Sequence, residues 1–234
     1  MAITFGVATA AGTTTAFGRG GDGTVTVTLP TSWAVGQLAI LLVYLDQGAC
    51  SVTTPATGWT EVSGSPWGSA TPKLRAFYRF LQSGDVDPII TVTGSSGTLQ
   101  TTAAIATFVG VDTSTPVEVV GAASAGTGTP MTAAEITTLT AYAWALGLCG
   151  RGDNETSSGQ SFGGSTTGVT ERLDAGNGVG DDAQVSIYSK EITSPGATGA
   201  GSAATSVTDP WVSVIIALRP GVFLSVSESV NFEV

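Results

Sequence analysis

The segment Leu38-Ala39-Ile40-Leu41-Leu42-Val43-Tyr44-Leu45 decides the fold class, because it is the longest apolar run in the chain. Its length is that of a strand and falls far short of the roughly 20 residues that a membrane helix needs. No position in the run is polar, so we expect a strand that is buried on both faces. The earlier segment Thr24-Val25-Thr26-Val27-Thr28 alternates with period two, which predicts a strand with one face in the core.

The composition favours β-structure throughout. The 234 residues include 36 threonines and 32 glycines, and only 11% are charged. Branched side chains such as threonine and valine suit a pleated surface, and glycine suits tight turns. We therefore predict an all-β chain, whose first part contains the strands Thr24–Leu29, Leu38–Leu45, Trp59–Val62, Leu74–Leu81, Ile89–Thr93 and Thr101–Val109. A helical turn fits only at Ala133–Leu139.

Two parts of the sequence resemble each other at a constant offset of 110 residues. Gly58-Trp59-Thr60-Glu61-Val62 is echoed by Gly168-Val169-Thr170-Glu171-Arg172, and Ala76-Phe77-Tyr78-Arg79 is echoed by Ser186-Ile187-Tyr188-Ser189. Ile105 and Ile215 keep the same offset. We interpret this pattern as an internal duplication of one sheet-forming unit.

Two such units are expected to cover each other's apolar faces, since a sheet with one apolar face has to bury it. The predicted fold is a jelly-roll-like β-sandwich built from the two duplicated sheet units. We place the first unit at residues 1–116 and the second unit at residues 117–220 of the same sandwich. Residues 221–234 then form a C-terminal β-strand arm.

The arm has its own alternating pattern. In an extended strand every second residue points to the same face. One face of the arm is apolar and consists of Val222, Leu224, Val226, Val230, Phe232 and Val234, with Glu228 as its only interruption. Within the duplicated unit no partner is left for this strand. The arm either joins an edge of its own sandwich or augments a sheet of a neighbouring chain, and we expect its apolar residues to bind a partner.

Composition also excludes several classes of function. The chain has no histidine, which removes Ser-His-Asp and Cys-His catalysis and histidine-ligated zinc. A formal net charge of −10 without a basic cluster argues against nucleic-acid binding. We see neither a secretory signal nor a membrane segment, and we expect no cofactor and no enzymatic activity.

For each polar candidate site, a structural role explains the residues better than a function does. Arg151-Gly152-Asp153 matches the integrin-binding tripeptide, but a polar loop over Gly150–Gly164 explains it as well. Asp85/Asp87, Asp153/Asn154/Glu155 and Asp181/Asp182 could supply oxygen ligands for calcium or a glycosidase pair, yet none has the spacing of a known calcium loop. The expected metal set is therefore none. Cys50 and Cys149 each end an apolar run, where small buried thiols are common.

The tryptophans offer one candidate for partner binding. Trp33 and Trp59 are interpreted as lids on the ends of the core, because Trp59 aligns with Val169 in the second unit. Trp67 belongs to Gly64-Ser65-Pro66-Trp67-Gly68-Ser69, which reads as an exposed loop tip, so we take Trp67 as a candidate contact with a partner. Gly18–Gly23 precedes a strand rather than a helix and is not a phosphate loop.

The repeated motifs resemble a known module. Gly58–Val62, Ala76–Leu81, Ile90–Gly94 and Ala103–Pro116, with the closing Val214-Ile215-Ile216-Ala217-Leu218-Arg219-Pro220, resemble a duplicated β-sandwich module encoded in virion gene clusters of tailed bacteriophages. The resemblance covers about residues 1–220 and carries no catalytic residues. It implies a virion structural protein, assembled in the host cytoplasm.

Within that class we expect a capsid decoration (cement) protein. It would bind the major capsid protein or other virion proteins and stabilise the shell through protein–protein contacts and C-terminal strand pairing. By analogy with decoration proteins it is expected to be a homo-oligomer, with a trimer as the guess. The alternative is a receptor- or glycan-binding adhesin module of a head fibre, tail fibre or baseplate.

Overall fold

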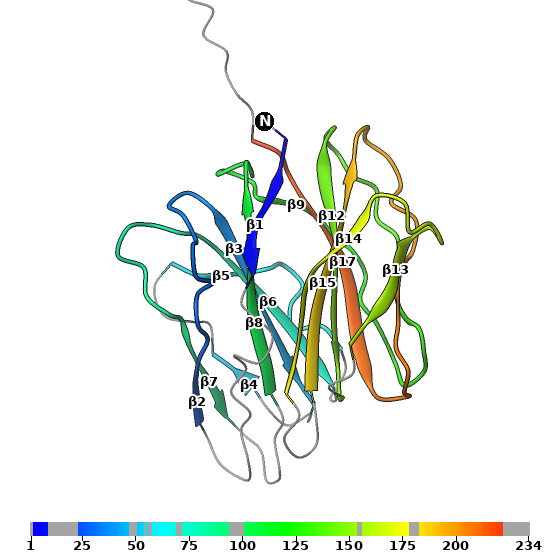
Figure 1. Ribbon diagram of the computed structural model, residues 1–234, viewed down its shortest axis with the longest axis horizontal. Helices are drawn as coiled ribbons and strands as arrows, with labels where there is room; N and C mark the ends of the chain where they lie inside the picture. Colours follow the sequence, from blue (N-terminus) through cyan, green and yellow to red (C-terminus); the bar gives the residue numbers. More distant parts are fainter. Residues whose placement is uncertain are drawn as a thin grey trace, which may run out of the picture.

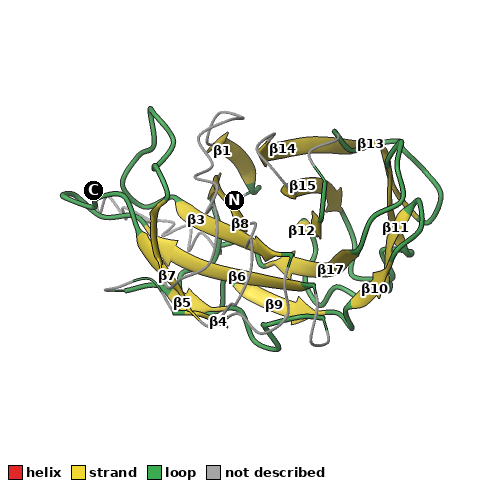
Figure 2. Ribbon diagram, turned by 90° about the horizontal axis from the view of Figure 1, so that it is seen from below, coloured by secondary structure: helices red, strands yellow, loops and turns green. Residues whose placement is uncertain are grey.

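The computed structural model describes residues 2–8, 23–46, 51–53, 55, 58–68, 72–93, 101–153, 156–177 and 183–221. These residues form β-strands joined by turns and loops, and they include no helix. The prediction of an all-β chain is confirmed. Figure 2 shows the strands in yellow without any helix between them, so the helical turn considered at Ala133–Leu139 is not formed.

The first half of the chain forms two antiparallel sheets. A five-stranded sheet has the order β1-β8-β3-β6-β5, and a three-stranded sheet has the order β2-β7-β4. The strands are β1 (Thr4–Ala8), β2 (Gly23–Thr26), β3 (Leu38–Leu45), β4 (Ser51–Val52), β5 (Thr60–Glu61), β6 (Lys73–Phe80), β7 (Ile89–Thr93) and β8 (Thr101–Val109). The strands expected at Leu38–Leu45, Ile89–Thr93 and Thr101–Val109 are therefore confirmed with the same bounds.

The second half also forms a large and a small sheet. The large sheet has the order β10-β17-β12-β15-β14, with β9 also paired to β17, and the small sheet has the order β11-β16-β13. The strands are β9 (Val117–Val120), β10 (Ser124–Gly126), β11 (Met131–Ala133), β12 (Ala143–Arg151), β13 (Ser158–Phe162), β14 (Val169–Asn177), β15 (Ala183–Ile192), β16 (Gly201–Ala204) and β17 (Trp211–Leu218).

The two halves repeat one strand order. In the large sheets β8-β3-β6-β5 corresponds to β17-β12-β15-β14, and in the small sheets β2-β7-β4 corresponds to β11-β16-β13. The segments matched by the 110-residue offset lie on corresponding strands, since Tyr78 is on β6 and Tyr188 is on β15. The duplication and the jelly-roll topology stay predictions from sequence, and this shared order supports the duplication.

The sheets are stacked in four layers around three cores. The two large sheets face each other across a central core, to which β3 contributes Ile40 and Leu42 and β12 contributes Leu146 and Leu148. The small sheets cover the outer faces. Alternate β3 residues, such as Leu41, therefore point into a second core beneath β7, and a third core lies between β12 and β16. Every residue of β3 is fully buried, which confirms the strand expected to be buried on both faces.

This layering refines the expected packing of the units. We expected each unit to supply one sheet of a single sandwich, whereas each half is itself a sandwich of a large and a small sheet. The physical reason is the uninterrupted apolar sequence of β3, which leaves a second face to cover. Figure 1 shows the first-half strands on the left and the second-half strands on the right.

Strands of the two large sheets contact one another across the central core. Strand β8 contacts β14 and β15, and its counterpart β17 contacts β6. Buried Phe108 on β8 and the largely buried Trp144 on β12 meet edge to face at one end of the central core, with ring centroids 6.1 Å apart. The two halves therefore share the central core, while each keeps an outer core of its own.

Candidate functional site

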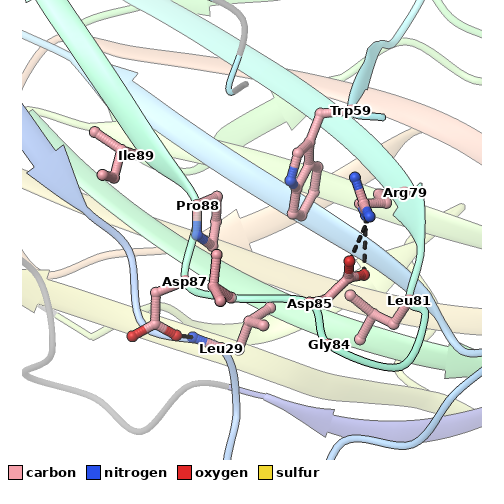
Figure 3. A pocket seen from close by; sticks show the side chains of 10 residues that line it. Leu29, Trp59, Arg79, Leu81, Gly84, Asp85, Asp87, Pro88 and Ile89 are labelled. Carbon is pink, nitrogen blue, oxygen red and sulfur yellow. Dashed lines mark hydrogen bonds and ion pairs between the residues drawn. The ribbon is translucent and has the colours of Figure 1, made fainter. Parts of the chain in front are cut away.

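A pocket opens at one end of the first half, where β6 leads into β7 (Figure 3). Its volume is about 320 Å³. Apolar side chains, an aromatic ring and three charged groups line it, namely Leu29, Trp59, Arg79, Leu81, Asp85, Val86, Asp87, Pro88 and Ile89, together with Gly84. Trp59 comes directly before β5 and Arg79 lies on β6, whereas both aspartates lie on the β6–β7 connection.

Arg79 and Asp85 form a two-bond ion pair at the rim of the pocket. The Nε of Arg79 donates to Oδ2 of Asp85 at 2.9 Å, and its Nη2 donates to Oδ1. The backbone N–H of Gln82 donates to the same carboxylate at 2.9 Å. Burial alone would raise the pKa of Asp85, but the bonds from Arg79 and Gln82 outweigh it and hold that pKa below its ordinary value. The pair is thus charged and fixed in orientation at neutral pH.

Asp87 links the pocket to the segment between β2 and β3. Its Oδ1 accepts a hydrogen bond from the backbone N–H of Leu29 at 2.7 Å (Figure 3). Its other carboxylate oxygen accepts no hydrogen bond from the residues that the structure describes. Beside it, Val86 is 80% exposed and Ile89 is 52% exposed, so the mouth of the pocket has an apolar margin.

Gly58 makes room for the arginine of this site. It has a φ of +78°, a conformation that favours glycine. A Cβ at this position would lie 2.3 Å from Nη1 of Arg79. A second depression of about 340 Å³ lies on this side and is lined by Gly58, Thr60, Tyr78 and Arg79 among others. Arg79 therefore separates two adjoining hollows on the surface of β6.

The tripeptide Arg151-Gly152-Asp153 is not the polar surface loop that the sequence suggested. Arg151 ends β12, is 1% exposed and forms an ion pair of 3.0 Å with Asp153. It also donates to the backbone carbonyl of Val207 at 3.1 Å. An integrin-type contact needs an exposed arginine, so this arrangement excludes one in the folded chain.

Sequence reasoning noted Asp153 but missed Asp46 and Asp209, the other carboxylates near Arg151. Asp209 precedes β17, and Asp46 follows β3, where it accepts a hydrogen bond from the Tyr44 hydroxyl at 3.3 Å. Burial raises the pKa of Asp209, followed by its hydrogen bond with Asp153, while Arg151 lowers it, and the net pKa is raised. Burial also raises the pKa of Tyr44, with Asp46 acting in the same direction. The only signal available in sequence was position, since Asp46 directly follows the apolar strand β3 and Asp209 lies just before the apolar strand β17.

The structure corrects the expectation for Trp67. It is 5% exposed and packs in the central core, with backbone hydrogen bonds to Leu74 in both directions. Glycine, proline and serine around it suggested a loop tip, but the bridge to Leu74 folds this segment back onto β6. Trp67 is therefore not available as a partner contact. Trp33 and Trp59 are partly buried against the outer core of the first half, which agrees with the lid interpretation.

Some of the remaining predicted sites lie outside the residues that the structure describes, and the others lie within them. Asn154, Glu155, Asp181, Asp182, Gly18–Asp22, Cys50 and the arm residues Val222, Leu224, Val226, Val230, Phe232 and Val234 lie outside the described residues. In the part of the chain that is described, no three acidic or cysteine side chains are arranged to hold a metal ion. Cys149 is a buried free thiol, and burial raises its pKa to about 12, so it stays protonated at neutral pH.

Comparison with known proteins adds no relative. Neither a protein-family model nor a curated protein nor a solved structure matches the chain. Within the described residues, no helix has the length and hydrophobicity needed to span a membrane.

Proposed function

We propose that this chain is a structural protein of a tailed-phage virion, and specifically a capsid decoration protein that reinforces the shell through protein–protein contacts. In this proposal the chain works without a cofactor and without catalysis. It is incorporated into the virion in the host cytoplasm, as a homo-oligomer with a trimer as the working guess. The motifs that resemble the duplicated virion module, on strands arranged in one repeated order, support the structural class.

The observation that carries the decoration role is the anchored root of the C-terminal arm. Pro220 forms a β-bridge with Val111, and the N–H of Gly221 donates to the carbonyl of Gly110 at 2.8 Å. Gly110 follows β8 of the first half, whereas Gly221 follows β17 of the second half. The alternating sequence after Gly221 therefore starts from a point that is fixed to both halves.

In this proposal, residues 222–234 pair as a β-strand with the partner from this anchored root. Main-chain pairing of such a strand with a sheet of the major capsid protein needs no special side chains, and its apolar face adds buried area. Because the root is fixed, little freedom of the sandwich itself is lost on binding. A protein that binds only the assembled shell stabilises it by mass action.

Co-sedimentation with capsid shells tests this role, using shells of a phage that encodes the chain. The full chain is expected to sediment with the shells, whereas a chain ending at Gly221 is expected to stay folded and remain in solution. Phe232→Asp, on the apolar face, should reduce binding, and Asn231→Asp, on the polar face, is its matched control. Binding by the truncated chain would show that the arm is not the clamp, and failure of that chain to fold would show that the arm belongs to its own sandwich.

The second candidate is a receptor- or glycan-binding module of a head or tail fibre. The pocket beside Trp59 is the observation that favours it, because an aromatic ring and fixed charged groups meet at an open surface. A fibre protein would be present in few copies per particle, which distinguishes the two candidates without reference to ligand binding.

A further inference from the structure

We propose that the pocket beside Trp59 binds a neutral saccharide, one pyranose ring at a time, with the ring stacked on the indole and its hydroxyls bonded to Asp87 and to the Arg79–Asp85 pair. This inference is independent of the decoration role, since a shell protein and a fibre protein could both carry such a site.

The indole supplies the apolar wall that a sugar ring needs. Trp59 is partly buried against the outer core of the first half, and it also lines the pocket (Figure 3). A flat ring of this kind matches the C–H face of a pyranose and leaves the hydroxyls free to point outward. The core behind it holds the indole in place, so little ordering is required on binding.

The polar groups at the rim match adjacent hydroxyls. Asp85 is held by Arg79 and by the N–H of Gln82, with side-chain exposures of 15% for Arg79 and 11% for Asp85. Asp87 is oriented by the N–H of Leu29 and keeps its second oxygen available to accept a proton from a hydroxyl. The same pocket wall therefore carries carboxylate acceptors and a charged Arg79–Asp85 pair beside the indole.

Charge restricts the ligand to a neutral one. Two carboxylates face one guanidinium in the pocket, and the whole chain carries −10. Anionic sugars and phosphates are repelled by this field. A quaternary ammonium is held by several aromatic faces, whereas Trp59 is the one aromatic ring in the lining, and Arg79 stands beside it.

The size of the pocket fits one ring. Its volume of about 320 Å³ lies at the lower end of small-molecule sites. The exposed side chains of Val86 and Ile89 continue the apolar surface beyond the mouth, where a second sugar unit of a longer glycan would lie.

The fold does not require this combination of residues. The positions that the 110-residue offset matches to Trp59 and Arg79 are Val169 and Ser189, and the second half forms the same strand order without them. A tryptophan, an arginine and two acids at the open end of one half are thus additions to the common framework. That difference favours binding over a purely structural role.

Saturation-transfer NMR of the full chain tests the site directly. The probes are the methyl glycosides of glucose, galactose, mannose and N-acetylglucosamine, with N-acetylneuraminic acid and tetramethylammonium as charged comparisons. At least one neutral glycoside is expected to receive saturation, strongest at its ring C–H protons, and neither charged probe should do so.

Variants locate the binding. Trp59→Ala and Asp87→Asn are each expected to weaken binding about tenfold or more. The amide introduced by Asp87→Asn keeps an oxygen for the N–H of Leu29, so this variant should fold even if Trp59→Ala does not. Trp33→Ala is the matched control, since Trp33 packs on the same core outside the pocket and should leave binding unchanged.

The proposal is overturned if no neutral glycoside binds, if binding survives both Asp87→Asn and Trp59→Ala without change, or if a charged probe binds instead. None of these results bears on shell binding by the arm, which is measured by co-sedimentation.

Discussion

The guanidinium carbon of Arg172 lies 4.8 Å from the centre of the Trp144 ring and 5.0 Å from the centre of the Phe5 ring. Phe5 belongs to the large sheet of the first half, while Arg172 and Trp144 belong to that of the second half. Arg172 occupies a register shift of β14 between Glu171 and Leu173. One cation in contact with two aromatic rings therefore links the large sheets of the two halves.

Replacing Arg172 is expected to weaken the joint between the halves. Arg172→Met removes both cation–π contacts and the hydrogen bond from Nε to Oγ of Ser189, while keeping much of the apolar stem. The loss should be about 1–2 kcal/mol in the free energy of unfolding, measured by urea denaturation. Lys190→Met removes a charge from the neighbouring strand β15 and is the control. Equal effects of both substitutions would mean that Arg172 does not join the halves.

A glycine at the centre of β12 should be irreplaceable for steric reasons. A Cβ at Gly147 would lie 2.0 Å from the ring of Tyr188, whose strand is paired to β12 at this position. Gly147→Ala is therefore expected to cost about 3 kcal/mol or to prevent folding, because a packed core does not absorb an added methyl group. Gly128→Ala, where nothing lies within 4 Å of the added atom, is the control and should be nearly neutral. A melting temperature unchanged in both variants would contradict the tight packing of β12 against β15.

The burial of Trp67 changes what its substitution should do. Trp67→Ala is expected to lower the free energy of unfolding by about 3 kcal/mol, since a large buried ring leaves a cavity. Trp33→Ala should cost less, because Trp33 is only partly buried. Guanidinium denaturation of the two variants measures the difference. A Trp67→Ala protein as stable as the unchanged chain would restore the exposed-loop interpretation.

The carboxylates around Arg151 predict a specific pH dependence. The folded-state pKa of Asp209 is raised, by burial and then by its bond with Asp153, in the field of Asp46, Arg151 and Tyr44. Its contribution to stability is thus complete below the ordinary carboxyl pKa of about 4 and is lost as pH rises through the raised value. Asp209→Asn should therefore stabilise the protein at about pH 7 and have no such effect near about pH 3.

Asp112 is the comparison, because its pKa is lowered whereas that of Asp209 is raised. Backbone N–H groups of Thr115 and Ser114 lower its pKa, so its contribution is present at neutral pH and lost as pH falls through the lowered value. Asp112→Asn should destabilise the protein at neutral pH. Thermal melting of both variants across this pH range measures the two effects, and the same sign for both would show that the hydrogen bonds do not control these groups.

The larger elements followed from the sequence because their signals are local. The apolar run of β3 and the alternation of Thr24–Thr28 at β2 specify strands without reference to distant residues. The constant offset likewise pointed to corresponding strands, such as β6 and β15. What sequence could not supply was the number of layers, because the small sheets depend on short strands such as β4 and β13, whose patterns are weak.

The polar sites depended on contacts between distant segments and were less predictable. Asp85 was noted as an acid, but its role in the pocket depends on Arg79 and Gln82 across a turn. Asp153 was assigned to a loop, although Arg151 and Asp209 draw it into a largely buried cluster. The prediction for Trp67 was wrong because glycine and proline are typical of exposed turns, and only the pairing with Leu74 buries it.

The number of copies of this chain per particle tests the central claim most directly. Quantitative mass spectrometry of purified virions, with the major capsid protein as internal standard, gives that number. Decoration of a symmetric shell predicts on the order of hundreds of copies, in a fixed ratio to the capsid protein. A count of about a dozen or fewer, as symmetry allows for a tail or baseplate component, would contradict the claim.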